Sequence, residues 1–431
     1  MYDLRSIQKA SAEVLILRSV SNDYSNRLEY LESGDWFMGF FGNVVWHILR
    51  NRLFDSVRPS LIHFDVYRLK GELVSPGSVF SVLIVGSKMS VEYFAKAFFL
   101  GKPTVEFLGR FSLNRVASSL GQLSADLTIV ESSWFFSRFL VDTGFFLSPR
   151  VDFILDIADS LEVVQSRVAR DKRRRLRQVA EAGYTFEVTK DLSKLASFYY
   201  DVYLPHMLRR HSGHALPISY SECKELFLKG ELLLVKSGEE CVSGSLLVHR
   251  EDELWQPVLG VKDVDTKFTL GSYAIYRSSI VVGIEQGFAR MDFGEAPPFM
   301  QDGLFKFKKG LGMWVRPALG SSAQVFGVRF SGVGEFVRCF LSVQPFVFVD
   351  GAGLSGLVFL ECVDDLSVKS FCVPGLAGLY VVSSSVDVSG LKVFRFEALS
   401  VEDCLRGGSA VLRFLGRVCV DGKYSLYRIT R

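Results

Sequence analysis

Short apolar runs alternate with helical patterns through the first 157 residues of the chain. Two stretches, 91–100 and 113–125, carry apolar residues at the three- and four-residue spacing of an amphipathic helix. Runs rich in β-branched and aromatic residues predict strands at 13–20, 61–69, 79–86, 104–109 and 126–132. This alternation predicts a layered α/β unit over residues 1–157. No GxGxxG motif follows any of these strands, so the pattern does not indicate a dinucleotide site.

A longer helical pattern follows, and one flank of it is strongly basic. Ser160 is a candidate N-cap, and an apolar stripe continues to Gly183, which is predicted to end the helix. At 100° per residue, four arginines of this segment fall on one side, clear of the stripe: Arg167, Arg170, Arg174 and Arg177. Two interpretations stay open, a solvated helix face or contact with phosphate or nucleic acid.

The next segment predicts a helix, three strands, a second helix and a fourth strand. The first helix, 192–210, contains Pro205, which must kink or break it. Tight polar turns separate three strands, so these can form an antiparallel meander without a crossover helix: 231–235, 241–249 and 254–261. The helix over 272–286 ends at Gly287, and a short strand over 289–293 follows it.

Residues 321–431 are rich in Val, Gly, Ser and Phe and contain no chemical motif. Strand patterns occur at 323–330, 346–349, 356–361, 379–384 and 391–396, and a final hairpin over 418–430 turns at Asp421-Gly422. The whole pattern predicts three domains: 1–157, 158–320 and a β-rich 321–431. The predicted fold class is α/β (α+β), with mixed sheets flanked by helices.

Composition narrows the class of protein. Apolar residues make up 48% of the 431 residues, which suffices for large cores in more than one domain. The formal net charge is only +3, so an anionic partner must be held by a local basic patch. Seven cysteines without a CxxC pair, and histidines 206, 211 and 214 at unsuitable spacing, indicate neither a disulfide framework nor a metal site. We therefore expect a cytoplasmic protein without a metal.

No apolar run has the pattern of a secretory signal or a membrane span. The most apolar stretches, 36–49 and 346–360, are short or interrupted by polar residues, and we expect both to pack in a core. Membrane contact is therefore not expected. The alternative is peripheral contact through five aromatic residues of the first stretch: Trp36, Phe37, Phe40, Phe41 and Trp46.

The most informative stretch runs from Asp292 to Gly312 and reads DFGEAPPFMQDGLFKFKKGLG. It joins an acidic strand end, a Gly/Pro-rich loop and three lysines. It resembles the closing motif of the Fem-type aminoacyltransferases and their relatives in the GNAT acyltransferase superfamily. Four further pieces that resemble this family precede it in the expected order: GFFLSPRVDFILDI, RRRLRQVAEAG, YDVYLPHMLRRHSG and LGSYAIYRSSIVVGIEQGFARMDFG. The resemblance covers about 145–316 and implies a GNAT-like lobe there. Fem-type enzymes pair two such lobes, which makes 1–157 a candidate diverged first lobe.

Candidate donor-binding and catalytic residues follow from these patterns. Thr269, Gly271 and Ser272 stand at a helix start, where free N–H groups and the helix dipole suit a phosphate. The resemblance places the pyrophosphate of acyl-CoA there, and an ordinary capped helix is the alternative. Lys308 is predicted to contact developing negative charge or a donor phosphate, and Asp292 to anchor the incoming ammonium. Two more lysines, Lys306 and Lys309, are predicted to support Lys308 or to be solvated.

Three residues are candidates for the acceptor. Glu295 follows a strand end at the expected cleft, and the resemblance implies acceptor contacts for Tyr203 and Arg209, with core packing as the alternative for the tyrosine. No Ser-His-Asp or Cys-His order and no GxSxG motif is present, so the pattern favours direct attack by an amine over a covalent intermediate.

The sequence therefore predicts an N-acyltransferase that moves an aminoacyl or acyl group from an activated donor to an amine. The two candidate donors are aminoacyl-tRNA and acyl-CoA, and Arg174 and Arg177 favour tRNA because a polyphosphate backbone contacts many guanidiniums at once. The acceptor is a small-molecule or peptide amine, and no tightly bound cofactor is expected. The rival hypothesis is a non-catalytic module that binds RNA or another polyanion through the same arginines.

Overall fold

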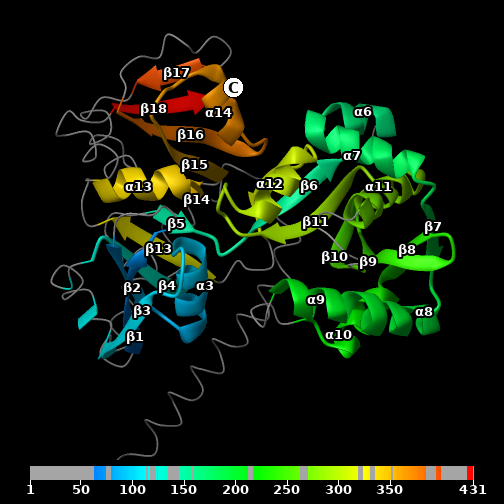
Figure 1. The fold of residues 1–431 in the computed structure, drawn as a ribbon, viewed down its shortest axis with the longest axis horizontal. Coiled ribbons are helices and arrows are strands. Elements are labelled where there is room, and N and C mark those ends of the chain that lie inside the picture. The colour runs from blue at the N-terminus through cyan, green and yellow to red at the C-terminus, as the bar shows by residue number, and fades with distance from the viewer. Residues whose placement is uncertain are drawn as a thin grey trace, which may run out of the picture. The chain divides into compact units, whose positions relative to one another are not determined.

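The computed structural model describes fourteen stretches of the chain. They are 63–73, 79–112, 115–116, 123, 125–133, 145–157, 160–211, 217–262, 270–318, 324–330, 335–350, 353–384, 395–398 and 425–430. The described residues form an α/β fold with two mixed sheets flanked by helices (Figure 1), as the sequence predicts. No helix within these stretches is long and apolar enough to cross a bilayer.

The seven-stranded sheet carries the segment that resembles the acyltransferases. Its strands are β6 (Val151–Asp156), β7 (Thr185–Thr189), β8 (Gly230–Ser237), β9 (Glu240–Arg250), β10 (Glu253–Val261), β11 (Arg290–Ala296) and β12 (Trp314–Pro317). Their order is β12-β6-β11-β10-β9-β8-β7. Strands β7 to β10 form the antiparallel meander that the polar turns predict, and β11 then runs parallel to β10.

Helices cover both faces of this sheet (Figure 1). On one face, α6 (Leu161–Ser166), α7 (Arg170–Glu181), α11 (Leu270–Glu285) and α12 (Gly303–Gly310) share a core with β6, β10 and β11. On the other face, α8 (Leu192–Ser197), a π-helix η3 (Phe198–Tyr203), α9 (Leu204–His211) and α10 (Tyr220–Leu228) accompany a second core. A π-helix has a looser hydrogen-bond ladder than an α-helix and is often found near functional sites.

Two glycines let the π-helix approach the sheet closely. Gly244 and Gly260 lie opposite each other on β9 and β10. A Cβ atom on Gly260 would come within 2.8 Å of the Cα of Tyr203, and one on Gly244 within 2.7 Å of the Phe198 ring. Only glycine leaves room for a backbone at this distance, so the pair fixes where η3 rests on the sheet.

The helix predicted from Ser160 to Gly183 is two helices. Between α6 and α7 the chain turns through Val168, which is buried, and Ala169, which is extended. The amide of Ala169 donates to the carbonyl of Gly310 at 2.8 Å instead of continuing the helix. Tertiary contact with α12 therefore overrides a helical pattern that has no local break signal.

The second sheet has eleven strands drawn from both ends of the chain. They are β1 (His63–Glu72), β2 (Val79–Val85), β3 (Thr104–Ser112), β4 (Leu127–Ser133), β5 (Phe145–Leu147), β13 (Gln324–Phe330), β14 (Phe346–Asp350), β15 (Gly353–Leu360), β16 (Leu376–Ser383), β17 (Arg395–Ala398) and β18 (Ser425–Thr430). Their order is β17-β18-β16-β15-β14-β5-β13-β4-β2-β1-β3.

This sheet does not follow the three domains predicted from the sequence. β13 pairs with both β4 and β5, so strands after residue 321 continue a sheet that begins before residue 157. The region predicted as β-rich also contains two helices, α13 (Glu335–Val343) and α14 (Asp365–Phe371). The strand predicted at 13–20 and most of the helix predicted at 113–125 lie outside the described residues.

One unit of four strands and a helix occurs three times in the described residues. It consists of an antiparallel pair, a helix, a strand parallel to the second of the pair, and an antiparallel fourth strand. The three copies are β1-β2-α3-β4 with β13, β9-β10-α11-β11 with β6, and β14-β15-α14-β16 with β18, where α3 is Lys88–Phe98. The first copy takes its strands from the eleven-stranded sheet and the second from the seven-stranded sheet; the expectation of two related lobes stays a prediction.

The Gly/Pro-rich loop after β11 joins the two sheets. Val347 donates to the carbonyl of Pro298, and Met300 donates to that of Pro345, both at 2.8 Å. Phe299 packs edge-on against Phe98 of α3 at 5.5 Å between ring centroids. This part of the conspicuous sequence motif therefore has a structural role, as an added strand-like contact at the edge of β14.

Candidate functional site

Two parallel strands separate near the centre of the seven-stranded sheet. β10 pairs with β11 through three residues only, from Glu253 to Trp255. β10 nevertheless continues to Val261, and β11 continues from Asp292 to Ala296. Register shifts follow Trp255 in β10 and Asp292 in β11. Beyond these residues the facing edges of the two strands do not pair with each other, and this opening is called the splay below.

The start of α11 lies at the open end of the splay. Ser243 pairs with Val261, the last residue of β10, and its hydroxyl donates to the carbonyl of Gly271 at 3.1 Å. The first amides of a helix have no intrahelical acceptor and lie at the positive end of its dipole. The structure thus brings Gly271 and Ser272 to the splay, whereas Thr269 lies outside the described residues. Phosphate binding there stays a prediction.

The matching helix start in the eleven-stranded sheet is filled by a carboxylate. One oxygen of Glu131, which follows the paired part of β4, accepts from the amide of Ser87 at 2.7 Å and from the hydroxyl of Ser90 at 2.5 Å. Ser87 is the N-cap of α3. The first turn of α11 contains no acidic residue. Among the described residues, no carboxylate is seen at the start of α11, in contrast to that of α3.

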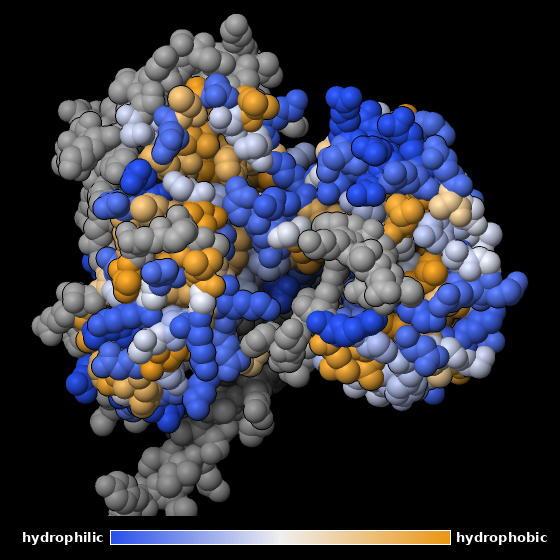
Figure 2. Space-filling model, in the orientation of Figure 1, coloured by the Kyte–Doolittle hydropathy of each residue, from blue (hydrophilic) through white to orange (hydrophobic). Residues whose placement is uncertain are grey.

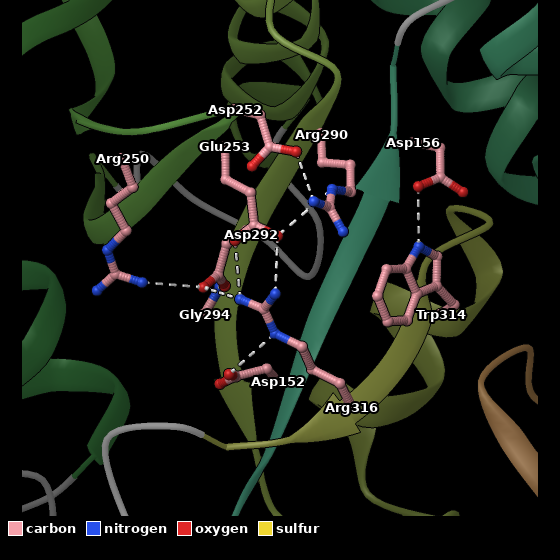
Figure 3. A network of polar contacts seen from close by, with 10 residues as sticks. All are labelled: Asp152, Asp156, Arg250, Asp252, Glu253, Arg290, Asp292, Gly294, Trp314 and Arg316. Carbon is pink, nitrogen blue, oxygen red and sulfur yellow. Dashed lines mark hydrogen bonds and ion pairs between the residues drawn. The ribbon is translucent and has the colours of Figure 1, made fainter. Parts of the chain in front are cut away.

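A network of carboxylates and guanidiniums lies beside the splay (Figure 3). Its centre is Asp292, which is 2% exposed. One carboxylate oxygen of Asp292 accepts from the amide of Gly294 at 2.8 Å, and the other lies 3.2 Å from Arg316 and 3.4 Å from Arg250. Burial raises the pKa of Asp292, while the Gly294 amide and the two arginines oppose that rise. Asp292 is thus already paired with cations of the protein itself.

Arg316 joins three strands of this network. It donates to both oxygens of Glu253, at 2.7 and 2.9 Å, and its Nε atom lies 3.5 Å from Asp152. Arg290 contacts Asp252 at 2.5 Å and Glu253 at 3.5 Å. The bidentate pair between Arg316 and Glu253 is geometrically demanding. The three carboxylates that Arg316 contacts lie on β6 (Asp152), β10 (Glu253) and β11 (Asp292). The network therefore fixes the closed end of the splay.

Lys308 lies in a cradle of main-chain carbonyl groups. Its ammonium donates to Phe293, Gly294 and Glu295 at 2.9, 3.0 and 3.0 Å, and the residue is 3% exposed. An ammonium has three N–H donors, so all are used. Burial lowers its pKa to about 8, and the nearby Asp292 and Asp152 oppose that fall. The predicted contact with a developing oxyanion would need one of these bonds to break, so the observed geometry favours a positioning role.

The other two lysines of the motif point elsewhere. Lys309 donates to the carbonyl of Ser370 near the end of α14, and burial lowers its pKa to about 8. Lys306 is exposed and donates to Gln301 at 3.0 Å. The three lysines that the sequence groups as one donor-binding patch therefore have three different environments.

The basic helix α7 packs beside the start of α11. Lys172 of α7 lies over the ring of Phe307 on α12 at 5.7 Å, and that ring lies 5.3 Å from Tyr273 of α11. Figure 2 shows hydrophilic residues gathered over α6 and α7. Three arginines of the predicted flank are exposed and have no ion-pair partner among the described residues: Arg170, Arg174 and Arg177. Arg167 lies outside both helices and donates to the carbonyl of Asp156.

The predicted acceptor residues do not come together. Tyr203 is the last residue of η3 and is buried, and its hydroxyl accepts from the amide of Ile218 at 3.1 Å. Arg209 is exposed on α9 and donates to the carbonyl of Pro205. Glu295 lies 3.6 Å from Arg150 at the edge of the splay. Of these three, Glu295 lies on one of the two strands that form the splay.

Six residues of the network (Figure 3) were not singled out from the sequence: Asp152, Arg250, Asp252, Glu253, Arg290 and Arg316. A signal for them exists, because Asp152 interrupts the apolar run VDFILD and Arg316 follows the motif within WVR. Charged residues on the inward positions of a strand are uncommon unless they are paired. Within the described residues no group of histidine, cysteine, aspartate or glutamate side chains could hold a metal ion.

Comparison with known proteins returns distant structural neighbours. FemX shares 14% identity and a TM-score of 0.34, over 61% of this chain and 84% of that one. The C-terminal domain of a putative lysylphosphatidylglycerol synthetase from Agrobacterium fabrum is 14% identical in sequence with a TM-score of 0.33, and the match covers 61% of this chain and 81% of that domain. A GCN5-related N-acetyltransferase from Kribbella flavida is 11% identical with a TM-score of 0.25, and the match covers 74% of this chain and 71% of that one. No protein-family model matches the chain, and no curated protein matches its sequence.

The structural neighbours thus include Fem-like and GNAT proteins, as the sequence resemblance predicts.

Proposed function

We propose that the chain is an N-acyltransferase that moves an aminoacyl or acyl group from an activated donor to an amine. The observation that carries this proposal is the splay between β10 and β11, with the start of α11 at its open end. Unpaired strand edges can hydrogen-bond an extended donor arm, while the first amides of α11 can hold a donor phosphate.

The reaction needs no covalent intermediate. The neutral acceptor amine attacks the donor carbonyl, a C–N bond forms, and the C–O or C–S bond to the carrier breaks. The amine proton leaves to solvent or to a nearby base. Lys308 contributes by fixing Phe293 to Glu295, the stretch of β11 that leaves its partner strand, so the edge of the splay is set before the donor binds.

Aminoacyl-tRNA is the donor that the charge of α7 favours. Residues 170–181 contain six cationic and two acidic side chains, and Arg170, Arg174 and Arg177 are exposed. A CoA donor carries few phosphates, whereas tRNA offers a continuous phosphate backbone to such a helix. Lys172 of α7 and Tyr273 of α11 both contact the ring of Phe307, so α7 would bring that backbone towards the helix start at which we propose that the donor phosphate binds.

Removal of positive charge from α7 tests which donor binds. We expect Arg174→Ala with Arg177→Ala to raise the Kd for tRNA about tenfold and to lower its salt dependence by about one to two counterions. Arg175→Ala is the matched control, since Arg175 already bonds Gln178 on the same helix. Transfer assays with labelled aminoacyl-tRNA and acyl-CoA, with and without RNase, then identify the carrier. Transfer from acyl-CoA that RNase leaves intact would overturn the tRNA assignment.

A second candidate function is a non-catalytic module that binds RNA or another polyanion. It is favoured by the full use of the Lys308 ammonium within the protein. This candidate predicts the same response of tRNA binding to the α7 variants but no turnover with either donor. Mass spectrometry of molecules that copurify with the full chain would show a bound tRNA, a CoA species or neither.

A further inference from the structure

Arg250 differs from its neighbours in the polar network. Arg316 uses its guanidinium on Glu253, Asp292 and Asp152, and Arg290 contacts two carboxylates. Arg250 makes one long bond, of 3.4 Å, to Asp292. Its side chain is 41% exposed, and no second acceptor for it is found among the described residues. A guanidinium has five N–H donors, so most of those on Arg250 are open to a ligand.

The guanidinium of Arg250 is nevertheless held in place. It lies over the ring of Trp255 at 3.6 Å from the ring centroid. Stacking on an aromatic face fixes the plane of the guanidinium and excludes water from one side of it. Burial lowers the pKa of Arg250, while Asp292 and Asp152 oppose that fall. A fixed, charged plane with free donors matches the two oxygens of a carboxylate or a phosphate.

This open guanidinium stands at the closed end of the splay. Trp255 is the last residue of β10 that pairs with β11, and its partner is Asp292. Leu254, next to it, packs in the core that contains α7 and α11. Because side chains alternate along a strand, Trp255 and Arg250 belong to the opposite face of the sheet. Donor phosphate and Arg250 would therefore approach the splay from different faces, which leaves room for a second substrate.

We propose that Arg250, stacked on Trp255, binds an oxyanion group of the acceptor, a carboxylate or phosphate on the same molecule as the reacting amine. This inference rests on the transferase function proposed above. The acceptor is thereby an amine that carries negative charge, such as an amino acid, a peptide terminus or an aminoalkyl phosphate. Arg250 holds its anionic end, and the amine extends towards the splay.

Binding without any donor tests the inference separately from turnover. The probes are glycine, O-phosphoethanolamine and ethanolamine, titrated into the full chain by isothermal calorimetry, with tryptophan fluorescence as a second readout. We expect wild type to bind at least one oxyanion-bearing amine at least tenfold more tightly than ethanolamine. Arg250→Met should weaken that ligand at least tenfold, while Arg250→Lys retains part of the affinity because it keeps the charge without the fork.

Lys224→Met, at an exposed position on α10, is the control for loss of one positive charge and should bind like wild type. Tighter binding of glycine would identify a carboxylate, and tighter binding of O-phosphoethanolamine a phosphate. Equal affinity of wild type for all three amines would overturn the proposal, as would unchanged oxyanion binding in Arg250→Met. If circular dichroism shows that Arg250→Met does not fold, the proposal is tested by the wild-type affinities for the three amines and by the affinities of Arg250→Lys. A protein that passes these tests but transfers nothing would refute only the transferase function.

Discussion

Replacement of Lys308 by methionine separates a structural from a catalytic role for this lysine. The change keeps most of the apolar stem and removes the ammonium from Phe293, Gly294 and Glu295. A buried carbonyl left without its donor costs ~1–3 kcal/mol, so three lost bonds cost about 3–9 kcal/mol. Against this stands the cost of burying the charge. The pKa falls from 10.5 to about 8, which corresponds to about 3 kcal/mol. We expect a net loss of about 3 kcal/mol in unfolding free energy at pH 7.

The difference between wild type and Lys308→Met should also depend on pH. Between pH 8 and 10.5 the unfolded chain holds the Lys308 proton and the folded chain does not, because the folded pKa is the lower one. The unfolding free energy of the wild type therefore rises with pH in this window. The gain that Lys308 contributes is lost again as pH falls through the folded pKa. From pH 7 to 9.5 this group adds about 2 kcal/mol, and the methionine variant lacks that gain. The gap should widen from about 3 to about 5 kcal/mol.

Urea unfolding at pH 7 and at pH 9.5, followed by tryptophan fluorescence, measures the difference in unfolding free energy between wild type and Lys308→Met and its change with pH. Lys306→Met is the matched control because Lys306 is exposed on the same helix, and it should stay within about 0.5 kcal/mol of wild type. A gap for Lys308→Met below that size at pH 7, or one that does not widen with pH, would refute the carbonyl cradle as a stabilising feature. A variant as stable as wild type but without turnover would return Lys308 to the catalytic role predicted from the sequence.

Two further substitutions test how the two sheets are shaped. Gly260→Ala should cost about 1–3 kcal/mol, because its methyl group would meet the backbone of Tyr203; Gly101→Ala, which meets no atom within 4 Å, is the control in the same urea titration. Glu131→Gln should cost about 1–2 kcal/mol, since it removes a charge from the start of α3, whereas Glu92→Gln on the exposed side of that helix should change stability little. Equal effects of the paired variants would contradict these assignments.

Local patterns in the sequence were sufficient to place the elements around the splay. The strand predicted over 254–261 is β10, and the helix predicted over 272–286 is α11, with bounds that differ by one or two residues. Their boundaries are set by polar turns and by Gly287, which has a positive φ of 77°. Such signals act within a few residues, so a single sequence contains them.

Pairing between distant segments could not be predicted in this way. β13 takes β4 and β5 as neighbours across the whole intervening segment that forms the seven-stranded sheet, and any apolar strand of similar length has the same local pattern. The break between α6 and α7 has the same origin, since the carbonyl of Gly310 supplies the acceptor for Ala169. A domain division drawn from composition therefore failed where long-range contacts decide the architecture.

The candidate site shows the same limit at the level of side chains. The motif residues Asp292, Glu295 and Lys308 all lie at or beside the splay, and their part in a functional site stays a prediction. The motif does not predict which groups these residues contact, because the three carbonyl groups around Lys308 come from an irregular stretch of β11. Arg250 was missed because its stacking on Trp255 is visible only when β9 and β10 are paired.

The tie between Pro298 and Val347 has a consequence for how the protein tolerates mutation. The segment that borders the splay runs directly into a contact with β14. The aromatic core around Phe346 and Phe299 therefore holds this segment in position. If the proposed function holds, substitutions that abolish activity would arise in that core as well as near Asp292. A fragment that keeps the seven-stranded sheet alone would retain every residue of the opening and lose its shape.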